Sequence, residues 1–94
     1  KLPIPVSFDW DKANVNKNWE RHKVNSKEAE EVFLNKPLKI LKDIEHSQKE
    51  ERLMAFGITN KNRILYIVFT IRKEKIRVIS ARDQSKRERR FYEK

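Results

Sequence analysis

The sequence predicts an α+β fold in which a small, twisted antiparallel β-sheet carries packed helices. Residues 52–59, 63–70 and 76–81 are rich in β-branched and aromatic residues, and the short polar gaps between them are typical of hairpins. Two helical segments precede these strands and a capped one follows. With a short strand at residues 6–10, the predicted order is β-α-α-β-β-β-α, and residues 1–94 are expected to form one domain.

The N-terminal part predicts a strand followed by a helix. Residues 6–10 alternate apolar and polar side chains, which is the two-residue period of a strand. Asp11 is a suitable N-cap for a helix over roughly residues 12–22. Three residues at helical spacing form the predicted buried face of that helix: Val15, Trp19 and His22.

A second helix begins after Asn25 or Ser26. With Asn25 as the N-cap, Glu28 occupies the third helical position and completes a capping box. Pro37 ends this helix. Residues 42–51 have few apolar groups and no clear period, so a loop is expected there.

The C-terminal half predicts a sheet with a helix after it. Residues 64–70 are apolar on both alternating faces, which places this strand at the centre of the sheet. Ser85 and Glu88 form a second capping box, so a helix is expected from Lys86 onward.

The composition favours a polyanionic partner. The net charge is +9, and ten basic against four acidic residues lie between positions 72 and 94. The absence of cysteine excludes disulfides, thiolate zinc sites and cysteine nucleophiles, and it favours a reducing cytoplasm. No apolar run reaches the roughly 18 residues that span a bilayer, so no membrane contact is expected.

Two arginines flank the end of the last predicted strand. Arg77 lies on an otherwise apolar strand face, where it either reaches water past Ile79 or is held for an anion. Arginine suits phosphate, because its planar fork donates two parallel hydrogen bonds. Strict alternation puts Arg77 and Arg82 on opposite faces, so a shared phosphate site requires a distortion near Ala81.

The last predicted helix is crowded with cations. Arg89 and Arg90 also suit a helix C-terminus, which explains two of the charges but not the excess. Phe91 is expected to dock the helix on the sheet, whereas Tyr92 is open to a role in stacking or proton transfer. Four residues of this helix are the candidate RNA-backbone contacts: Lys86, Arg87, Arg89 and Arg90.

Acid–base and metal chemistry have weaker support. His22 ends a helix face, and His46 lies in the predicted loop without an assignable partner. No recognised metal-ligand spacing is present, so no metal and no other cofactor is expected. The residues of this region whose side chains could ligate a metal are Asp43, Glu45, His46, Glu50 and Glu51.

The chain resembles the BrnT toxins of bacterial type II toxin–antitoxin pairs nearly from end to end. The resemblance rests on four segments in order: FDWDKANVNKNWERHKV, KEAEEVF, EERLMAFG and IRVISARDQSKRERRFYEK. It implies a RelE-like fold and a cytoplasmic ribonuclease that arrests translation. It also implies a ribbon-helix-helix antitoxin as the cognate partner, with operator DNA contacted only through that antitoxin.

The family pattern matches individual positions of this chain. We expect metal-independent cleavage by 2′-hydroxyl attack, with Arg77 and Arg82 on the phosphate, Arg52 assisting, and Glu51 or Tyr92 as the proton acceptor. Lys23 and Gln84 depart from the pattern, in which a glycine and a small residue are usual. The matching positions are Arg52 after Glu51, Arg77, Ser80, Arg82, Glu88, Arg89 and Tyr92.

Two other functions fit the same residues. A non-catalytic basic module that binds RNA or DNA explains the net charge of +9 and the basic helix. A protein docking surface for an acidic antitoxin segment or a ribosomal partner is compatible with a ribonuclease, because an antitoxin often covers the surface that a toxin uses.

Overall fold

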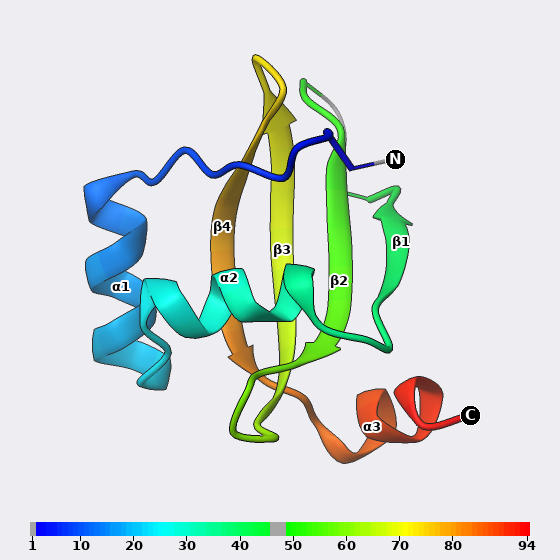
Figure 1. The fold of residues 1–94 in the computed structure, drawn as a ribbon. Helices are drawn as coiled ribbons and strands as arrows, with labels where there is room; N and C mark the ends of the chain where they lie inside the picture. The colour runs from blue at the N-terminus through cyan, green and yellow to red at the C-terminus, as the bar shows by residue number, and fades with distance from the viewer. Residues whose placement is uncertain (1, 46–48) are drawn as a thin grey trace.

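A four-stranded antiparallel sheet with three helices forms the described part of the chain (Figure 1). The computed structural model describes residues 2–45 and 49–94. The strands follow the spatial order β1-β2-β3-β4, so β2 and β3 are interior. The elements are α1 (Lys12–His22), α2 (Ser26–Leu34), β1 (Lys39–Asp43), β2 (Arg52–Ile58), β3 (Ile64–Arg72), β4 (Lys75–Asp83) and α3 (Lys86–Tyr92).

The predicted α+β class, with an antiparallel sheet and packed helices, is confirmed, and two details of the order differ. Residues 6–10 form only a single parallel bridge, between Phe8 and Ile76. A longer strand is not possible here, because Asp11 already caps helix α1 directly after residue 10. The edge strand β1 was not predicted, because lysines interrupt its alternation and its pairing with β2 is what defines it.

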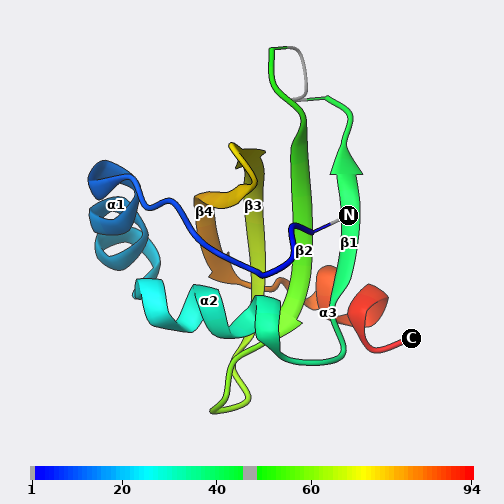
Figure 2. The ribbon, with the colours of Figure 1, turned by 45° about the horizontal axis from the view of Figure 1, so that its top comes forward.

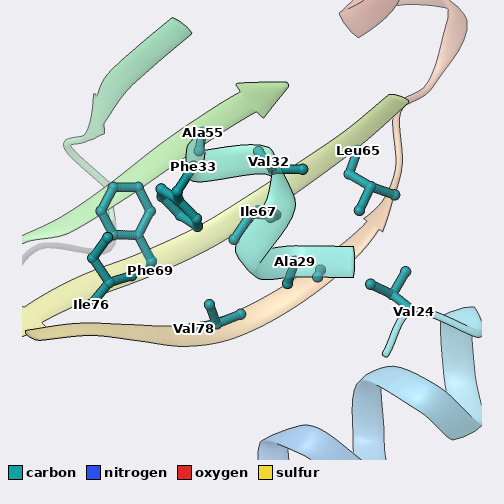
Figure 3. Packing of buried hydrophobic residues seen from close by; sticks show 11 residues of the cluster. Val24, Ala29, Val32, Phe33, Ala55, Leu65, Ile67, Phe69, Ile76 and Val78 are labelled. Atoms are coloured by element: carbon teal, nitrogen blue, oxygen red, sulfur yellow. The ribbon is translucent and has the colours of Figure 1, made fainter. Parts of the chain in front are cut away.

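Helix α2 crosses one face of the sheet and covers the hydrophobic core (Figures 1 and 3). Val32 and Phe33 of α2 meet Ile67 and Phe69 of β3, and all four are buried. Gly57 of β2 allows this close approach, since a Cβ atom there would lie 2.6 Å from Val32 Cγ1. We call this covered side the core face.

Helix α1 lies beside β4 rather than over the sheet. Asn18 Oδ1 accepts a hydrogen bond from the Ala81 N–H at 3.2 Å, and Lys17 Nζ donates to the Ile79 carbonyl at 3.1 Å. These bonds cover the outer edge of β4, which would otherwise expose unpaired backbone groups. The predicted buried face of α1 was wrong at Trp19, which is 48% exposed, because the helix turns Asn18 toward the strand edge.

Helix boundaries follow the caps that the sequence indicated. Asp11 caps α1, Asn25 and Glu28 form the capping box of α2, and Ser85 and Glu88 form that of α3. Each cap satisfies backbone N–H groups that a helix start leaves free.

Arg63, at the start of β3, joins four parts of the fold. Its guanidinium forms a fork with Asp83 at 2.7 and 3.1 Å and contacts Glu28. It also donates to the carbonyls of His22 and Lys23 at the end of α1. The hydrogen bonds to Asp83 raise the pKa of Arg63, and Arg63 in turn lowers the pKa of Asp83.

The other face of the sheet is covered only at one end, by α3 (Figure 2). The Phe91 ring lies 5.0 Å from that of Phe56, which confirms the docking expected of Phe91. Phe91 remains 37% exposed, whereas Tyr92 is buried and its hydroxyl donates to the Pro37 carbonyl at 2.6 Å. We call the remaining surface on this side the open face.

Among the described residues, no helix is long and apolar enough to cross a bilayer.

Candidate active site

A β-bulge in β4 decides where its arginines point. Val68 pairs with Ser80, but the next residue of β3, Phe69, pairs with Val78. Ile79 is therefore an extra residue on β4. The distortion lies at Ile79, two residues before the position that the sequence indicated.

The bulge places the β4 candidates on one face of the sheet. Arg77 is opposite Thr70, Ser80 opposite Val68 and Arg82 opposite Tyr66. These three β3 residues alternate with the core residues Ile67 and Phe69, so their partners on β4 share the open face. The expectation from strict alternation, which put Arg77 and Arg82 on opposite faces, was wrong because one inserted residue reverses it.

Arg52 of β2 belongs to the same face. Met54 pairs with Val68 of the open face, and Arg52 is two residues before Met54. The structure thus places Arg52 of β2 on the same face as Arg77, Ser80 and Arg82 of β4, with β3 between the two strands. Their β3 partners, Thr70 and Tyr66, are four residues apart, so Arg77 and Arg82 stand about 14 Å apart along β4, at about 3.4 Å per residue.

Arg77 is held by two carboxylates of the N-terminal segment. Its Nη2 donates to Asp9 at 3.0 Å, and its Nη1 lies 3.5 Å from Asp11. Its Nε is buried and has no hydrogen-bond partner among the residues described. The segment is anchored because the Asp9 N–H donates to the Ile76 carbonyl at 2.9 Å.

Arg82 sits between a carboxylate and a ring. Both of its terminal nitrogens donate to Glu88 at 2.9 Å, and its guanidinium lies 4.2 Å from the centre of the Tyr66 ring. The bonds from Arg82, with that from the Ser85 N–H, lower the pKa of Glu88. Burial raises the pKa of Tyr66. The α3 capping box therefore also orients an arginine of the open face.

Glu50 is a carboxylate near these arginines that the sequence suggested only as a metal-ligand type and not as a catalytic residue. Its oxygens accept from Arg72 at 2.7 and 3.0 Å, and these bonds lower the pKa of Glu50, with the charges of Arg77 and Arg52 adding to the effect. The position of the Glu50 side chain is set by Arg72, at the end of β3. No local sequence pattern indicates that these two residues meet.

Glu51, which the sequence suggested as a proton acceptor, points to the other side of the sheet. Its carboxylate lies 3.5 Å from Lys42, which pairs with Leu53 on the core-face side of the sheet. Alternation from Arg52 gives Glu51 the same direction. The structure does not bring Glu51 to the arginines.

The remaining candidates lie apart from the arginines. Burial raises the pKa of Tyr92, whose hydroxyl proton is engaged by Pro37. His22 is at the end of α1, and His46 lies outside the described residues. The cations of α3 are all solvent-exposed: Lys86, Arg87, Arg89 and Arg90. Within residues 2–45 and 49–94, no cluster of three or more His, Cys, Asp or Glu could hold a metal ion.

Comparison with known proteins identifies the family. A sequence model described as the ribonuclease toxin BrnT of type II toxin–antitoxin systems matches residues 10–88. The chain belongs to this family. Membership makes it a BrnT family ribonuclease toxin, with RNA as its substrate and an antitoxin protein as its partner. No curated protein sequence matches the chain.

A solved BrnT structure supports the same assignment. The chain is similar to the crystal structure of the Brucella abortus ribonuclease toxin BrnT, with 26% identity and a TM-score of 0.65. The match covers 86% of this chain and 99% of the Brucella chain. The BrnT fold thus extends over most of the sheet and helices described above.

Proposed function

We propose that this BrnT family toxin cleaves RNA on the open face of its sheet by attack of the 2′-hydroxyl on the adjacent phosphate. The 2′-hydroxyl gives up its proton to a carboxylate as a 2′-oxygen–phosphorus bond forms, and the bond to the 5′-oxygen breaks as that oxygen takes a proton from water. The products end in a 2′,3′-cyclic phosphate and a 5′-hydroxyl. The bulge at Ile79 carries this proposal, because it puts Arg77, Ser80 and Arg82 on one surface with Arg52.

The arginines supply charge stabilisation without a metal ion. Negative charge increases on the phosphate oxygens as the 2′-oxygen attacks, and fixed cations that face that charge lower the barrier. Arg77 and Arg82 are held in place by Asp9 and Glu88, so little reorganisation is needed at the moment of reaction. Arg52 assists from β2, and the Ser80 hydroxyl donates to the substrate backbone.

We place the proton acceptor at Glu50. Its carboxylate is held by Arg72 near the arginine cluster, whereas Glu51 contacts Lys42 on the other side of the sheet. Tyr92 then serves as a docking residue of α3. Hydrogen bonds from Arg72 lower the pKa of Glu50, so its carboxylate is unprotonated at neutral pH and has a free lone pair to accept a proton.

The exposed cations of α3 hold the RNA backbone beside the cleavage site. Phosphate contacts of this kind fix the position of a nucleic acid without reading its bases. Four side chains serve this role: Lys86, Arg87, Arg89 and Arg90.

The family suggests a cellular role, which is part of this proposal. We assign the toxin to the cytoplasm, where its cleavage of RNA arrests translation, and we treat residues 1–94 as one toxin domain. The cognate antitoxin is of the ribbon-helix-helix class and alone contacts operator DNA. Family membership and the +9 charge support this proposal.

The test of the chemistry is cleavage in the presence of a chelator. Purified toxin, free of antitoxin, is incubated with RNA in excess EDTA, and the product ends are analysed. We expect undiminished cleavage with 2′,3′-cyclic phosphate ends. Loss of cleavage in EDTA would refute the metal-independent mechanism, and salt-sensitive binding without any cleavage would favour the non-catalytic RNA-binding module.

A further inference from the structure

The two edges of the sheet differ in how far other parts of the chain cover them. The outer edge of β4 is covered by side chains of α1 and by residues 7–9. At the other edge, β1 is the outermost strand in both ribbon views (Figures 1 and 2). Among the described residues, no backbone hydrogen bond outside the sheet involves Ile40 or Lys42 of this strand.

The ladder shows which backbone groups of β1 point outward. The Thr59 N–H donates to the Arg63 carbonyl at 2.9 Å, directly beyond the paired ends of β2 and β3. Because bonding direction alternates along an antiparallel strand, Ala55 and Gly57 also bond toward β3, and Met54 bonds toward β1.

The register between β1 and β2 then determines the direction in which each backbone group of β1 points. Met54 pairs with Leu41 and Phe56 with Lys39, so Lys39 and Leu41 direct their N–H and C=O groups at β2. Ile40 and Lys42 lie between them and direct theirs away from the sheet. The outer edge of β1 therefore offers two N–H donors and two C=O acceptors at regular spacing.

This edge also exposes apolar side chains between its lysines. Ile40, Leu41 and Ile44 are 36%, 44% and 80% exposed, although edge strands normally avoid exposed apolar residues. The segment that leads into β1, residues 33–38, lines an open hollow of about 680 Å³. Leu34, at the end of α2, lines this hollow and is 66% exposed.

We propose that β1 is a docking edge for the antitoxin, an extended segment of which adds a fifth strand beside β1 and places an apolar side chain in the hollow at residues 33–38. Main-chain hydrogen bonds to Ile40 and Lys42 supply affinity, and the apolar contacts supply specificity. This inference rests on the antitoxin being the partner of the toxin.

An acidic, partly apolar antitoxin segment suits this edge better than a second copy of the toxin. Two toxin chains would each bring a net charge of +9 to the contact, whereas an acidic segment complements it. Lys36 lies at the hollow, and Lys39 and Lys42 lie on β1, where Lys39 contacts the Phe91 carbonyl and Lys42 contacts Glu51. The positive charge of this segment favours carboxylates on the added strand.

Amide hydrogen exchange tests the proposal on the unmodified protein. The toxin is studied alone and in complex with the cognate antitoxin, obtained by co-expression with the neighbouring gene. We expect the amides of Ile40 and Lys42 to exchange quickly in the free toxin and slowly in the complex, while that of Leu41 is protected in both. Unchanged exchange at Ile40 and Lys42 would overturn the proposal, as would their protection in the toxin alone through self-association.

A matched pair of variants tests the backbone contribution. Ile40→Pro removes an outward N–H without removing a bond to β2, and proline is tolerated at such edge positions. We expect it to weaken antitoxin binding about tenfold relative to Ile40→Ala, which keeps the N–H, since one hydrogen bond contributes about 1.4 kcal/mol or less. Equal affinities would contradict strand addition. Both variants should cleave RNA at the wild-type rate, so loss of docking is separable from failure of the ribonuclease proposal.

Discussion

Lys23 shows how a single residue ends α1 without the glycine that the family usually has there. It adopts the left-handed conformation, with φ 53° and ψ 39°, and its N–H bonds back to the helix. Its carbonyl accepts a hydrogen bond from Arg63 at 2.7 Å, which holds the chain in this conformation. The helix therefore ends at Lys23 without a glycine, because tertiary contacts offset the local strain.

Replacement of Lys23 by glycine should therefore stabilise the fold. Left-handed backbone costs a residue with a Cβ atom roughly 1–2 kcal/mol, and glycine avoids most of that cost. We expect Lys23→Gly to raise the free energy of unfolding, measured in urea, by about 1 kcal/mol. Lys23→Ala is the control, because it removes the same side chain but keeps the strain; an equal gain in both variants would contradict this explanation.

Glu50 is the residue whose titration tests the proposed proton acceptor. Hydrogen bonds from Arg72 hold its pKa below the ordinary glutamate value, so the carboxylate stays charged as the pH falls and accepts protons until the pH passes the lowered pKa. Cleavage should accordingly persist below pH 4.5 and then decline. Glu50→Gln should remove this acid limb and lower the cleavage rate by about 100-fold or more, with RNA binding retained.

The comparison for Glu50 uses two other glutamates. Glu20→Gln, on the exposed side of α1, should cleave at the wild-type rate. Glu51→Gln decides between the two adjacent carboxylates. A larger loss of rate in Glu51→Gln than in Glu50→Gln would return the role of proton acceptor to Glu51.

At the scale of elements, α1 matters because it covers the edge of the strand that carries the site. Asn18 is buried, and its Oδ1 accepts the Ala81 N–H next to Arg82. Asn18→Ala leaves that N–H buried and unpaired, so we expect a loss of about 1–3 kcal/mol in the free energy of unfolding. Asn14→Ala, which removes a longer bond of 3.4 Å to the Val78 carbonyl, should cost less. Similar losses would show that edge coverage by Asn18 is not special.

Elements defined by local signals were predictable from the sequence. Asp11, Asn25 and Ser85 mark helix starts because a cap needs only the next three residues. Strands β2 to β4 follow from runs of apolar residues between turns. Edge strand β1 was missed because its existence depends on pairing with β2.

The candidate site was predictable in residue type but not in arrangement. Arginine chemistry and the family resemblance singled out Arg77 and Arg82, yet their common face depends on the extra residue at Ile79. Nothing in the local sequence signals that bulge, since it is set by the register with β3. Glu50 was not singled out as a catalytic residue for a similar reason, because its place is fixed by Arg72 on another strand.

At the scale of the whole molecule, the hydrophobic core and the proposed cleavage site lie on opposite faces of the sheet. Helix α2 covers the core face and its buried apolar cluster, and α3 lies on the other side of the sheet (Figure 2). The open face carries Arg52 of β2 with Arg77 and Arg82 of β4. Six of the nine excess positive charges lie between residues 72 and 94, the part of the chain that forms this surface. A polyanion is therefore drawn to the side of the sheet that α2 leaves free.

The most direct test of this account is the cleavage rate of Arg77→Ala/Arg82→Ala against a variant of equal charge, Lys12→Ala/Arg21→Ala, whose changes lie on α1. Both are assayed on the same RNA in EDTA, at a temperature where thermal denaturation shows them folded. Loss of the two arginines should slow cleavage by at least about 1000-fold, as expected when donors to a developing anion are removed. The α1 variant should stay near the wild-type rate. Equal rates in the two variants would contradict cleavage on the open face.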